Sequence, residues 1–397
     1  MTARATATDR RLHPTVLRIA SVHFIVDGYS NILAPLLPLL IPRLGLSLAA
    51  AGTLTMLFQM AASVSQVAFG HLADRWRPRV LLLGGPFLAV AVLSFAGTAT
   101  SPVRLALLLL IGGLGGAAFH PPAAAVAYRL GGVRPGLAMS VHITGGSLGF
   151  SLGPLMFAPF AQRYGVEWTW LLVMPGLLVL GFLLARVPHI DLPRSEHGSF
   201  RALRPYARPL GLLYALVVLR TLTSLAFATF MPVLLTRKGM SLSQAGAAAT
   251  VFLFASGIGG FLGGPAADRF GPRRVIALSL VLAVPFLFAG TLTEDWAFVV
   301  LVSAGGFFLQ STLPVNVTFG QALAPVSAAT VSSLMMGFAW GSGGLSVPFV
   351  GMVADRIGIE ATLRWLSLVP LAAAALALPL PERPPARAVG PAAADPL

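Results

Sequence analysis

The sequence predicts an all-α membrane protein with twelve transmembrane helices arranged as two pseudo-symmetric halves of six. Of its 397 residues, 56% are hydrophobic and only 10% are charged, whereas a soluble chain would carry about a quarter charged residues. Apolar stretches of about 20 residues, long enough to cross a bilayer, recur along the whole chain. The second half also repeats the first in register. These observations exclude a soluble globular domain.

Short polar loops separate the twelve apolar stretches. The first six lie near residues 16–41, 50–71, 80–99, 103–128, 136–160 and 168–186. The second six lie near residues 209–236, 243–263, 275–292, 296–321, 327–353 and 361–380. We therefore predict a cytoplasmic N-terminal tail (1–15), an N-terminal six-helix bundle (16–186), a cytoplasmic linker (187–208), a C-terminal six-helix bundle (209–380) and a cytoplasmic C-terminal tail (381–397).

Basic residues predict the orientation in the membrane. With both termini in the cytoplasm, the tails and the even-numbered loops hold 18 of the 27 lysines and arginines, and the opposite loops hold 7. This bias follows the positive-inside rule, and it accounts for the net charge of +14 without a nucleic-acid partner. The first 15 residues lack an apolar core before a cleavage site, so they predict a tail and not a signal peptide. We expect a multi-pass protein of the inner (cytoplasmic) membrane.

An internal repeat relates the two halves. A shift of 194 pairs Pro38 with Pro232, Gly45 with Gly239, Ser47 with Ser241, Gly52 with Gly246, and Gly70 with Gly264. A shift of 193 pairs Gly112 with Gly305, Pro121 with Pro314, and Arg163 with Arg356. Two six-helix repeats of the same orientation are the plan of many secondary transporters, whose substrate site lies between the halves near the midplane.

Two loop motifs indicate a family. GHLADRWRPR (70–79) and GPAADRFGPRR (264–274) resemble the cytoplasmic loop motif of the major facilitator superfamily, although Arg77 replaces the usual glycine in the first copy. The resemblance implies a cytoplasmic gate, in which an aspartate engages arginines or the N-terminal end of a neighbouring helix. The alternative is that these arginines only set topology. The candidate gating residues are Asp74, Arg75, Arg79, Asp268, Arg269 and Arg273.

Three further stretches resemble the fosmidomycin-resistance branch of that superfamily. They are HFIVDGYSNILAPLLP, AFHPPAAAVAYRLGGVRPGLAMSVHITGGSLGFSLGP and GFAWGSGGL. The resemblance covers nearly the whole chain and implies a proton-driven drug exporter, without fixing the substrate. Gly149, Gly153 and Pro154 resemble the glycine–proline signature of proton antiporters, although Phe157-Ala158 replaces the usual following glycines. The same spacing is also common wherever helices pack closely.

Asp27 is the only one of the 13 acids that lies deep in a predicted span. A charged carboxylate in a bilayer costs about 2.5–3.5 kcal/mol on insertion scales, so a chain keeps one there for a reason. His23 and Asn31 lie one turn before and one turn after it on the same helical face. We therefore expect Asp27 and His23 to couple transport to protons and Asn31 to contact substrate. The alternative is a structural cluster that holds the first helix against a neighbour.

Arg220 is the other costly residue, at a matching depth in the seventh span. It is a candidate for binding an anionic substrate, because a guanidinium recognises phosphonate or carboxylate groups bidentately. It could also pair with Asp27 across the cavity. Four further polar residues in spans are candidate substrate contacts: His120, His142, Gln310 and Asn316. His120 is also a candidate proton relay. It precedes Pro121-Pro122, which predict a kink in the fourth span, and Pro314 predicts a matching kink in the tenth.

The sequence favours a proton-coupled exporter of small organic compounds, with anionic compounds as one candidate class. It leaves open an uptake symporter for a small organic anion, a carrier of a metal ion or chelate held by His23, Asp27, His120 and His142, and a non-transporting receptor. The chain has no cysteine and no nucleotide-binding glycine loop with its lysine. We expect no enzyme activity, catalytic residue, resident metal or cofactor. The expected partners are a small-molecule substrate, protons and the lipid bilayer, around a monomer.

Overall fold

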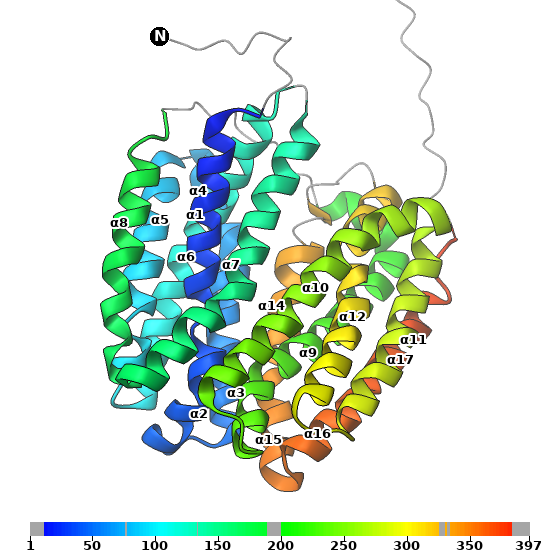
Figure 1. Cartoon of the computed structure of the whole chain (residues 1–397). Helices are drawn as coiled ribbons and strands as arrows, with labels where there is room; N and C mark the ends of the chain where they lie inside the picture. Colours follow the sequence, from blue (N-terminus) through cyan, green and yellow to red (C-terminus); the bar gives the residue numbers. More distant parts are fainter. Residues whose placement is uncertain are drawn as a thin grey trace, which may run out of the picture.

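The computed structural model describes residues 12–75, 78–132, 134–188, 200–324, 330–331 and 334–382. Every regular element in these ranges is a helix, which confirms the all-α fold class. The helices form two bundles, one from each half of the chain, that lie side by side (Figure 1). Most of the predicted tails and linker lies outside the described residues, so the boundaries of the five regions stay predictions.

The first bundle contains the first six predicted spans. α1 (Pro14–Ser30) and α2 (Leu33–Leu44) share the first span, and α3 (Leu48–Gln59), the π-helical turn η1 (Met60–Val64) and α4 (Ser65–Arg75) form the second. α5 (Pro78–Leu93) and η2 (Ala96–Thr98) form the third, α6 (Pro102–Leu130) the fourth and α7 (Pro135–Tyr164) the fifth. η3 (Val166–Leu172) and α8 (Val173–Leu184) complete the bundle.

The second bundle repeats this order. It begins with η4 (Phe200–Tyr206) and α9 (Ala207–Arg237), followed by α10 (Leu242–Phe270), α11 (Pro272–Gly290) and α12 (Asp295–Leu323). The described part of the eleventh span contains η6 (Leu334–Phe338), α14 (Ala339–Leu345) and α15 (Val347–Ile357). The twelfth contains α16 (Ile359–Leu366) and α17 (Val369–Ala377).

Ten helices in the described part are long and apolar enough to cross a membrane. The other two spans of the twelve-helix fold are the fifth and the eleventh. α7 is 30 residues long but rich in glycine and serine, and the eleventh span includes the undescribed residues 325–329 and 332–333. The prolines of the fourth and tenth spans do not interrupt their helices, because α6 and α12 each continue through them as one helix, and the predicted kinks stay predictions.

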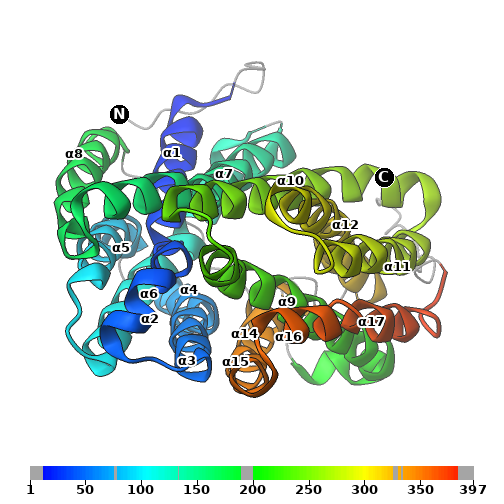
Figure 2. The same cartoon turned by 60° about the horizontal axis from the view of Figure 1, so that its bottom comes forward.

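The bundles have two ends, which we call the near and far faces. α1 begins and α17 ends at the near face, whereas α3 and α10 begin at the far face (Figure 1). The bundles converge towards the far face, where α3 packs against α15 and α7 packs against α10 (Figure 2). The internal sequence repeat thus corresponds to two similar bundles, which meet through helices at equivalent positions of the repeat.

α1 and α7 pack backbone to backbone where Gly145, Gly149 and Gly153 face α1. A side chain at Gly145, Gly149 or Gly153 would collide with the backbone carbonyl of Ala20, Phe24 or Gly28, respectively. This stripe, one residue per turn of α7, explains why the fifth span is rich in glycine. It also positions the polar residues of α1 against α7.

We predict that Gly149→Ala destabilises the protein. The new methyl group would overlap the carbonyl oxygen of Phe24, and a helix backbone cannot yield as a flexible side chain can, so the expected loss is about 1–3 kcal/mol. Thermal unfolding in detergent micelles, followed by tryptophan fluorescence, measures the loss. Gly181→Ala in α8 is the matched control, because nothing lies within 4 Å of its added carbon. Equal unfolding temperatures for the two variants would contradict the close packing.

Candidate proton and substrate site

Two helical turns of α1 hold the first part of the site. His23 and Asp27 face the same side of the helix, and the His23 Nε2 atom lies 3.1 Å from Asp27 Oδ2. The sequence prediction that these residues form one polar stripe is consistent with this spacing of i and i+4. Both side chains are largely buried, with 11% of His23 and 19% of Asp27 exposed.

His120 of α6 approaches the same carboxylate from a second helix. Its Nε2 atom lies 3.5 Å from Asp27 Oδ1, so the two oxygens of Asp27 face two different imidazoles. The rings of His23 and His120 stand edge to face with centroids 4.9 Å apart. Three residues that are distant in the sequence therefore share one small polar cluster.

His142 of α7 contributes in an unexpected way. Its backbone carbonyl lies 2.9 Å from His23 Nδ1, and its buried ring lies against the His23 ring at 4.3 Å between centroids. A carbonyl oxygen can only accept a hydrogen bond, so His23 Nδ1 must carry a hydrogen and donate it. The tautomer of His23 is thereby fixed, and Nε2 is the nitrogen that faces Asp27.

This fixed tautomer restricts what can lie between His23 and Asp27. A bare Nε2 lone pair facing a carboxylate would be repulsive, so the contact requires one proton between the two atoms. The proton can lie on the imidazole or on the carboxyl group, but the pair is neutral overall in either case. If the proton leaves, the pair carries one negative charge inside the bundle.

Packing leaves little room around this pair. A side chain at Gly146 of α7 would collide with His23 Nε2 and lie 2.7 Å from Asp27 Oδ2. Asn31, predicted to contact substrate, is 7% exposed, and its amide donates to the Phe150 carbonyl of α7 at 2.8 Å. Asn31 thus joins α1 to α7, as the structural alternative expected, and its role in substrate binding stays untested.

The cluster also has donor atoms of the kind that metals bind. One ligand atom from each of His23, Asp27 and His120 lies within 4.8 Å of the others. His142, which the sequence placed in a four-residue set, lies outside this group, and its ring Nδ1 is buried without a hydrogen-bond partner in the described protein. Three protein ligands with water as the fourth form a known arrangement for zinc, so the metal-carrier alternative stays a prediction for His23, Asp27 and His120.

Arg220 of α9 lies in the other bundle and is fully buried. Its Nη1 donates to Gln310 Oε1 of α12, its Nη2 donates to Thr221 Oγ1 at 3.2 Å, and its Nε has no partner in the described residues. Its guanidinium also lies over the ring of Trp340, 5.5 Å from the centroid. No carboxylate in the described part of the chain lies within ion-pair distance, so the buried charge has only neutral partners.

The sequence alternative of an ion pair between Arg220 and Asp27 is wrong for this structure. Asp27 pairs with the two histidines of its own bundle, and Arg220 bonds to residues of its own bundle. Asn316 is buried on α12, where its Nδ2 donates to Thr312 Oγ1 at 3.4 Å and its Oδ1 has no partner in the described chain. Each half therefore carries its own polar cluster.

Comparison with known proteins identifies the family of this two-bundle protein. The sequence model of the Major Facilitator Superfamily matches residues 19–236 and 213–396, which together cover most of the chain. The chain belongs to the major facilitator superfamily. As a member of this superfamily, it is a secondary transporter with many membrane spans.

Named relatives within this superfamily include resistance proteins. The chain is 30% identical to the fosmidomycin resistance protein of Escherichia coli (strain K12) over 385 residues, 93% of each protein. It is 24% identical over 281 residues to the multidrug resistance protein MdtG of Salmonella typhimurium (strain LT2), covering 66% of this chain and 69% of that protein. A solved structure of a bacterial homolog of the human lysosomal transporter Spinster, inward-facing and unoccupied, superposes with a TM-score of 0.73 and 19% identity over 92% of this chain and 95% of that one.

The candidate gating residues of this transporter make only contacts within their own half in the described part of the chain. Arg79 donates to the carbonyls of Pro188 and Val187, and Arg273 lies 4.0 Å from Glu382. Asp268 and Arg269 are exposed, and Arg269 lies over the ring of Phe270. The side chains of Asp74 and Arg75 lie outside the described residues, so the predicted gate stays a prediction.

The structure also contains polar contacts that the sequence reasoning missed. At the far face, Asp355 and Gln162 each bond to backbone N–H groups of the opposite bundle. Asp355 looked like an ordinary acid at a helix end. The available signal was the repeat, because a shift of 193 places Gln162 over Asp355.

Proposed function

We propose that this transporter is a proton-coupled antiporter that exports small organic compounds, anionic compounds among them, across the inner membrane by alternating access. The observation that supports this most directly is the pair of His23 and Asp27, whose geometry calls for one proton between them. A proton-coupled carrier needs a group that takes up a proton on one side of the membrane and gives it up on the other. A neutral, proton-holding pair within a membrane bundle has this property.

His120 provides a route for that proton. Its Nε2 lies 3.5 Å from the other oxygen of Asp27, so a proton that leaves the pair can pass to a second imidazole without crossing apolar space. Asp27 and His120 are also more exposed than His23, with about a fifth of each side chain accessible. We therefore assign Asp27 and His23 to proton binding and His120 to proton relay.

Arg220 supports the assignment of an anionic group on the substrate. A guanidinium without a carboxylate partner is costly in a bilayer, and it is stabilised by an anion that accepts two of its hydrogen bonds. Gln310 and Thr221 orient the guanidinium, while its free Nε leaves donor capacity for such a ligand. The substrate would then be bound between the clusters of the two halves.

Export favours antiport among the coupling schemes. The proton gradient across an inner membrane drives protons inward, so an exporter that uses it must exchange substrate for proton. The names of the two relatives, which describe resistance to fosmidomycin and to multiple drugs, support the direction of export.

A proton symporter for a small organic anion is the second candidate, and the charges favour it in one respect. When the pair of His23 and Asp27 has lost its proton, its negative charge balances the positive charge of Arg220, so binding an anionic substrate leaves the site with one excess negative charge. When the pair holds its proton it is neutral, and the anionic substrate balances the charge of Arg220. Co-binding of proton and anion is therefore electrostatically favourable, and the direction of the proton flux distinguishes the two candidates.

We predict that Asp27→Asn abolishes proton coupling while the protein still folds. The amide keeps the size of the side chain but cannot release a proton. In proteoliposomes given fosmidomycin and a panel of other drugs, we expect substrate-induced proton release by the parent and none by the variant, with counterflow of substrate retained. Asp295→Asn, at an exposed position outside the site, is the control and should behave as the parent.

The sign of the pH change tests the coupling scheme in the same vesicles. Substrate-dependent proton uptake by the parent would favour the symporter over the antiporter. Proton movement by Asp27→Asn at the parental ratio would show that the carboxylate is structural, and it would make His23 or His120 the next candidate for the proton site.

We predict that Arg220→Lys keeps part of the transport of an anionic drug and that Arg220→Ala loses most of it, about tenfold or more. Lysine preserves the charge but cannot form two parallel hydrogen bonds. Initial uptake rates into inverted membrane vesicles measure the effect, with Arg274→Ala as an exposed control. A neutral substitution that leaves transport of every anionic compound intact would remove Arg220 from the site.

We predict that the near face is cytoplasmic, as the arginine bias indicates. A reporter enzyme that is active only in the cytoplasm, fused after residue 200, should be active, and a periplasmic reporter at the same position should not. The reverse pattern would overturn the orientation and with it the proposed direction of transport.

A further inference from the structure

The far face contains a hydrogen-bonded contact between the two bundles. The carboxylate of Asp355, near the end of α15, accepts hydrogen bonds from the backbone N–H groups of Leu48 at 2.8 Å and Ala49 at 2.9 Å. These N–H groups belong to the first turn of α3, where a helix has no internal acceptors for them. A residue of the second half thus caps a helix of the first half.

The internal repeat produces a matching contact on the other side of the interface. Gln162 Oε1, near the end of α7, accepts from the N–H of Ser243 at 2.7 Å, in the first turn of α10. Each helix also caps itself, because Ser47 accepts from Ala50 and Ser241 accepts from Gln244. The two helix starts are therefore capped in the same way, by a serine of their own and by a residue of the opposite half.

Tight packing accompanies both contacts. A side chain at Gly52 of α3 would meet the backbone of Val347 and Pro348, and one at Gly351 of α15 would collide with the backbone of Leu48. Gly246 of α10 is similarly close to Ala158 of α7. No substrate can pass between helices that are in backbone contact, so the far face is closed in this structure.

We propose that Asp355 and Gln162 form a two-part latch that holds the far face closed, and that Asp355 sets the equilibrium between the two access states. The two parts differ in strength. Asp355 is an anion that accepts two bonds at the positive end of a helix dipole, whereas Gln162 is neutral and accepts one. Opening the far face must break both, and breaking the Asp355 contact costs more.

The pentapeptide around Asp355 supports this assignment. Residues 354–358 read ADRIG, and residues 267–271 at the near face read ADRFG. Both segments end a helix at a glycine in the left-handed region, Gly358 at φ 86° and Gly271 at φ 89°. In the described part of the chain Asp355 is engaged across the interface, whereas Asp268 is exposed without a polar partner. Two segments that differ at one position in five are thus latched on the closed face and unlatched on the other.

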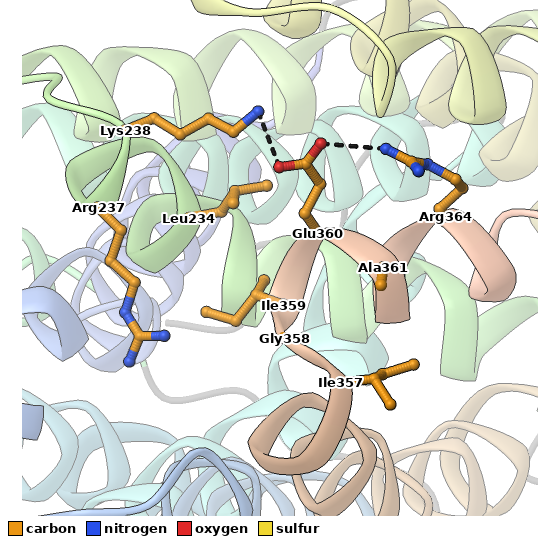
Figure 3. A pocket seen from close by; sticks show the side chains of 9 residues that line it. All are labelled: Leu234, Arg237, Lys238, Ile357, Gly358, Ile359, Glu360, Ala361 and Arg364. Atoms are coloured by element: carbon orange, nitrogen blue, oxygen red, sulfur yellow. Dashed lines mark hydrogen bonds and ion pairs between the residues drawn. The ribbon is translucent and has the colours of Figure 1, made fainter.

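A second charged cluster on the far face provides the control. Glu360 lies 3.1 Å from Lys238 and 3.1 Å from Arg364, beside a cavity of about 370 Å³ (Figure 3). All three residues belong to the second bundle, so these ion pairs do not cross the interface. Arg237 points away from this cluster in the same view (Figure 3). Glu360→Gln therefore changes an acid on the same face without touching the latch.

The chain has no cysteine, so a pair of introduced cysteines can be labelled without background. Val103 at the start of α6 and Leu292 between α11 and α12 are exposed at the far ends of the two bundles. Spin labels at Val103→Cys and Leu292→Cys, read by double electron–electron resonance in lipid nanodiscs, give the populations with the far face closed and open. This measurement requires only that the protein alternates between the two access states. Its outcome therefore does not depend on whether transport is coupled to protons or on the role of Arg220.

We expect Asp355→Ala to raise the open-to-closed ratio roughly 2- to 30-fold, the range that follows from loss of a helix cap. Asp355→Asn should give a smaller rise, because its amide oxygen accepts one bond without charge, and Glu360→Gln should give none. Gln162→Glu adds a charge to the weaker part and should lower the ratio. Because this last variant strengthens the closed state, it tests the latch even if Asp355→Ala does not fold. A ratio unchanged by Gln162→Glu, or changed equally by Glu360→Gln and Asp355→Asn, would overturn the proposal.

Discussion

The backbone contact between α1 and α7 is the constraint on which the candidate proton site depends. Glycines on one face of α7 allow it to approach α1 without intervening side chains. Only at this separation can the His142 carbonyl reach His23 Nδ1 and fix its tautomer. The fixed tautomer turns Nε2 towards Asp27, and this orientation produces the one-proton pair. Glycine content, helix packing and acid–base chemistry are therefore one connected feature of the first bundle.

Asp27 and Arg220, the costly groups of the two bundles, do not pair with each other in this structure. Asp27 pairs with histidines of α1 and α6, whereas Arg220 donates to neutral groups of α9 and α12 and keeps one unpaired donor in the described residues. Each bundle can therefore move as a unit without separating an ion pair in the bilayer core. Among the residues that the structure describes, the polar bonds that cross between the bundles lie at the far face, where water can replace them when the bundles separate. This distribution suits a molecule in which one bundle rocks against the other.

The fold and the position of Asp27 could be predicted from the sequence because both depend on hydrophobicity and repetition. A bilayer permits few alternatives to apolar helices, and a lone acid in an apolar span is conspicuous. The partners of Asp27 were harder to predict from the sequence. His23 follows from helical spacing, but the convergence of His120 depends on how α6 packs, and the tautomer depends on a backbone carbonyl that no side-chain pattern reveals. Asn31 adds a role that its sequence position does not reveal, because its amide joins α1 to α7, while its predicted contact with substrate stays a prediction.

The latch shows how repetition can reveal a contact that residue chemistry conceals. Asp355 and Gln162 differ in charge, so a search for similar residues does not pair them, although the repeat places them at equivalent positions. What the two halves preserve is the geometry of a helix end facing the start of a helix in the other half. An acceptor of either charge satisfies that geometry, because the N–H groups of a helix start need an acceptor and not a particular residue. The difference in charge then makes one contact stronger than its counterpart within a symmetric frame. A carrier that alternates between two states needs a closed face that is stable but can still open. A helix cap contributes about 0.5–2 kcal/mol, so two caps stabilise the closed face without making it permanent.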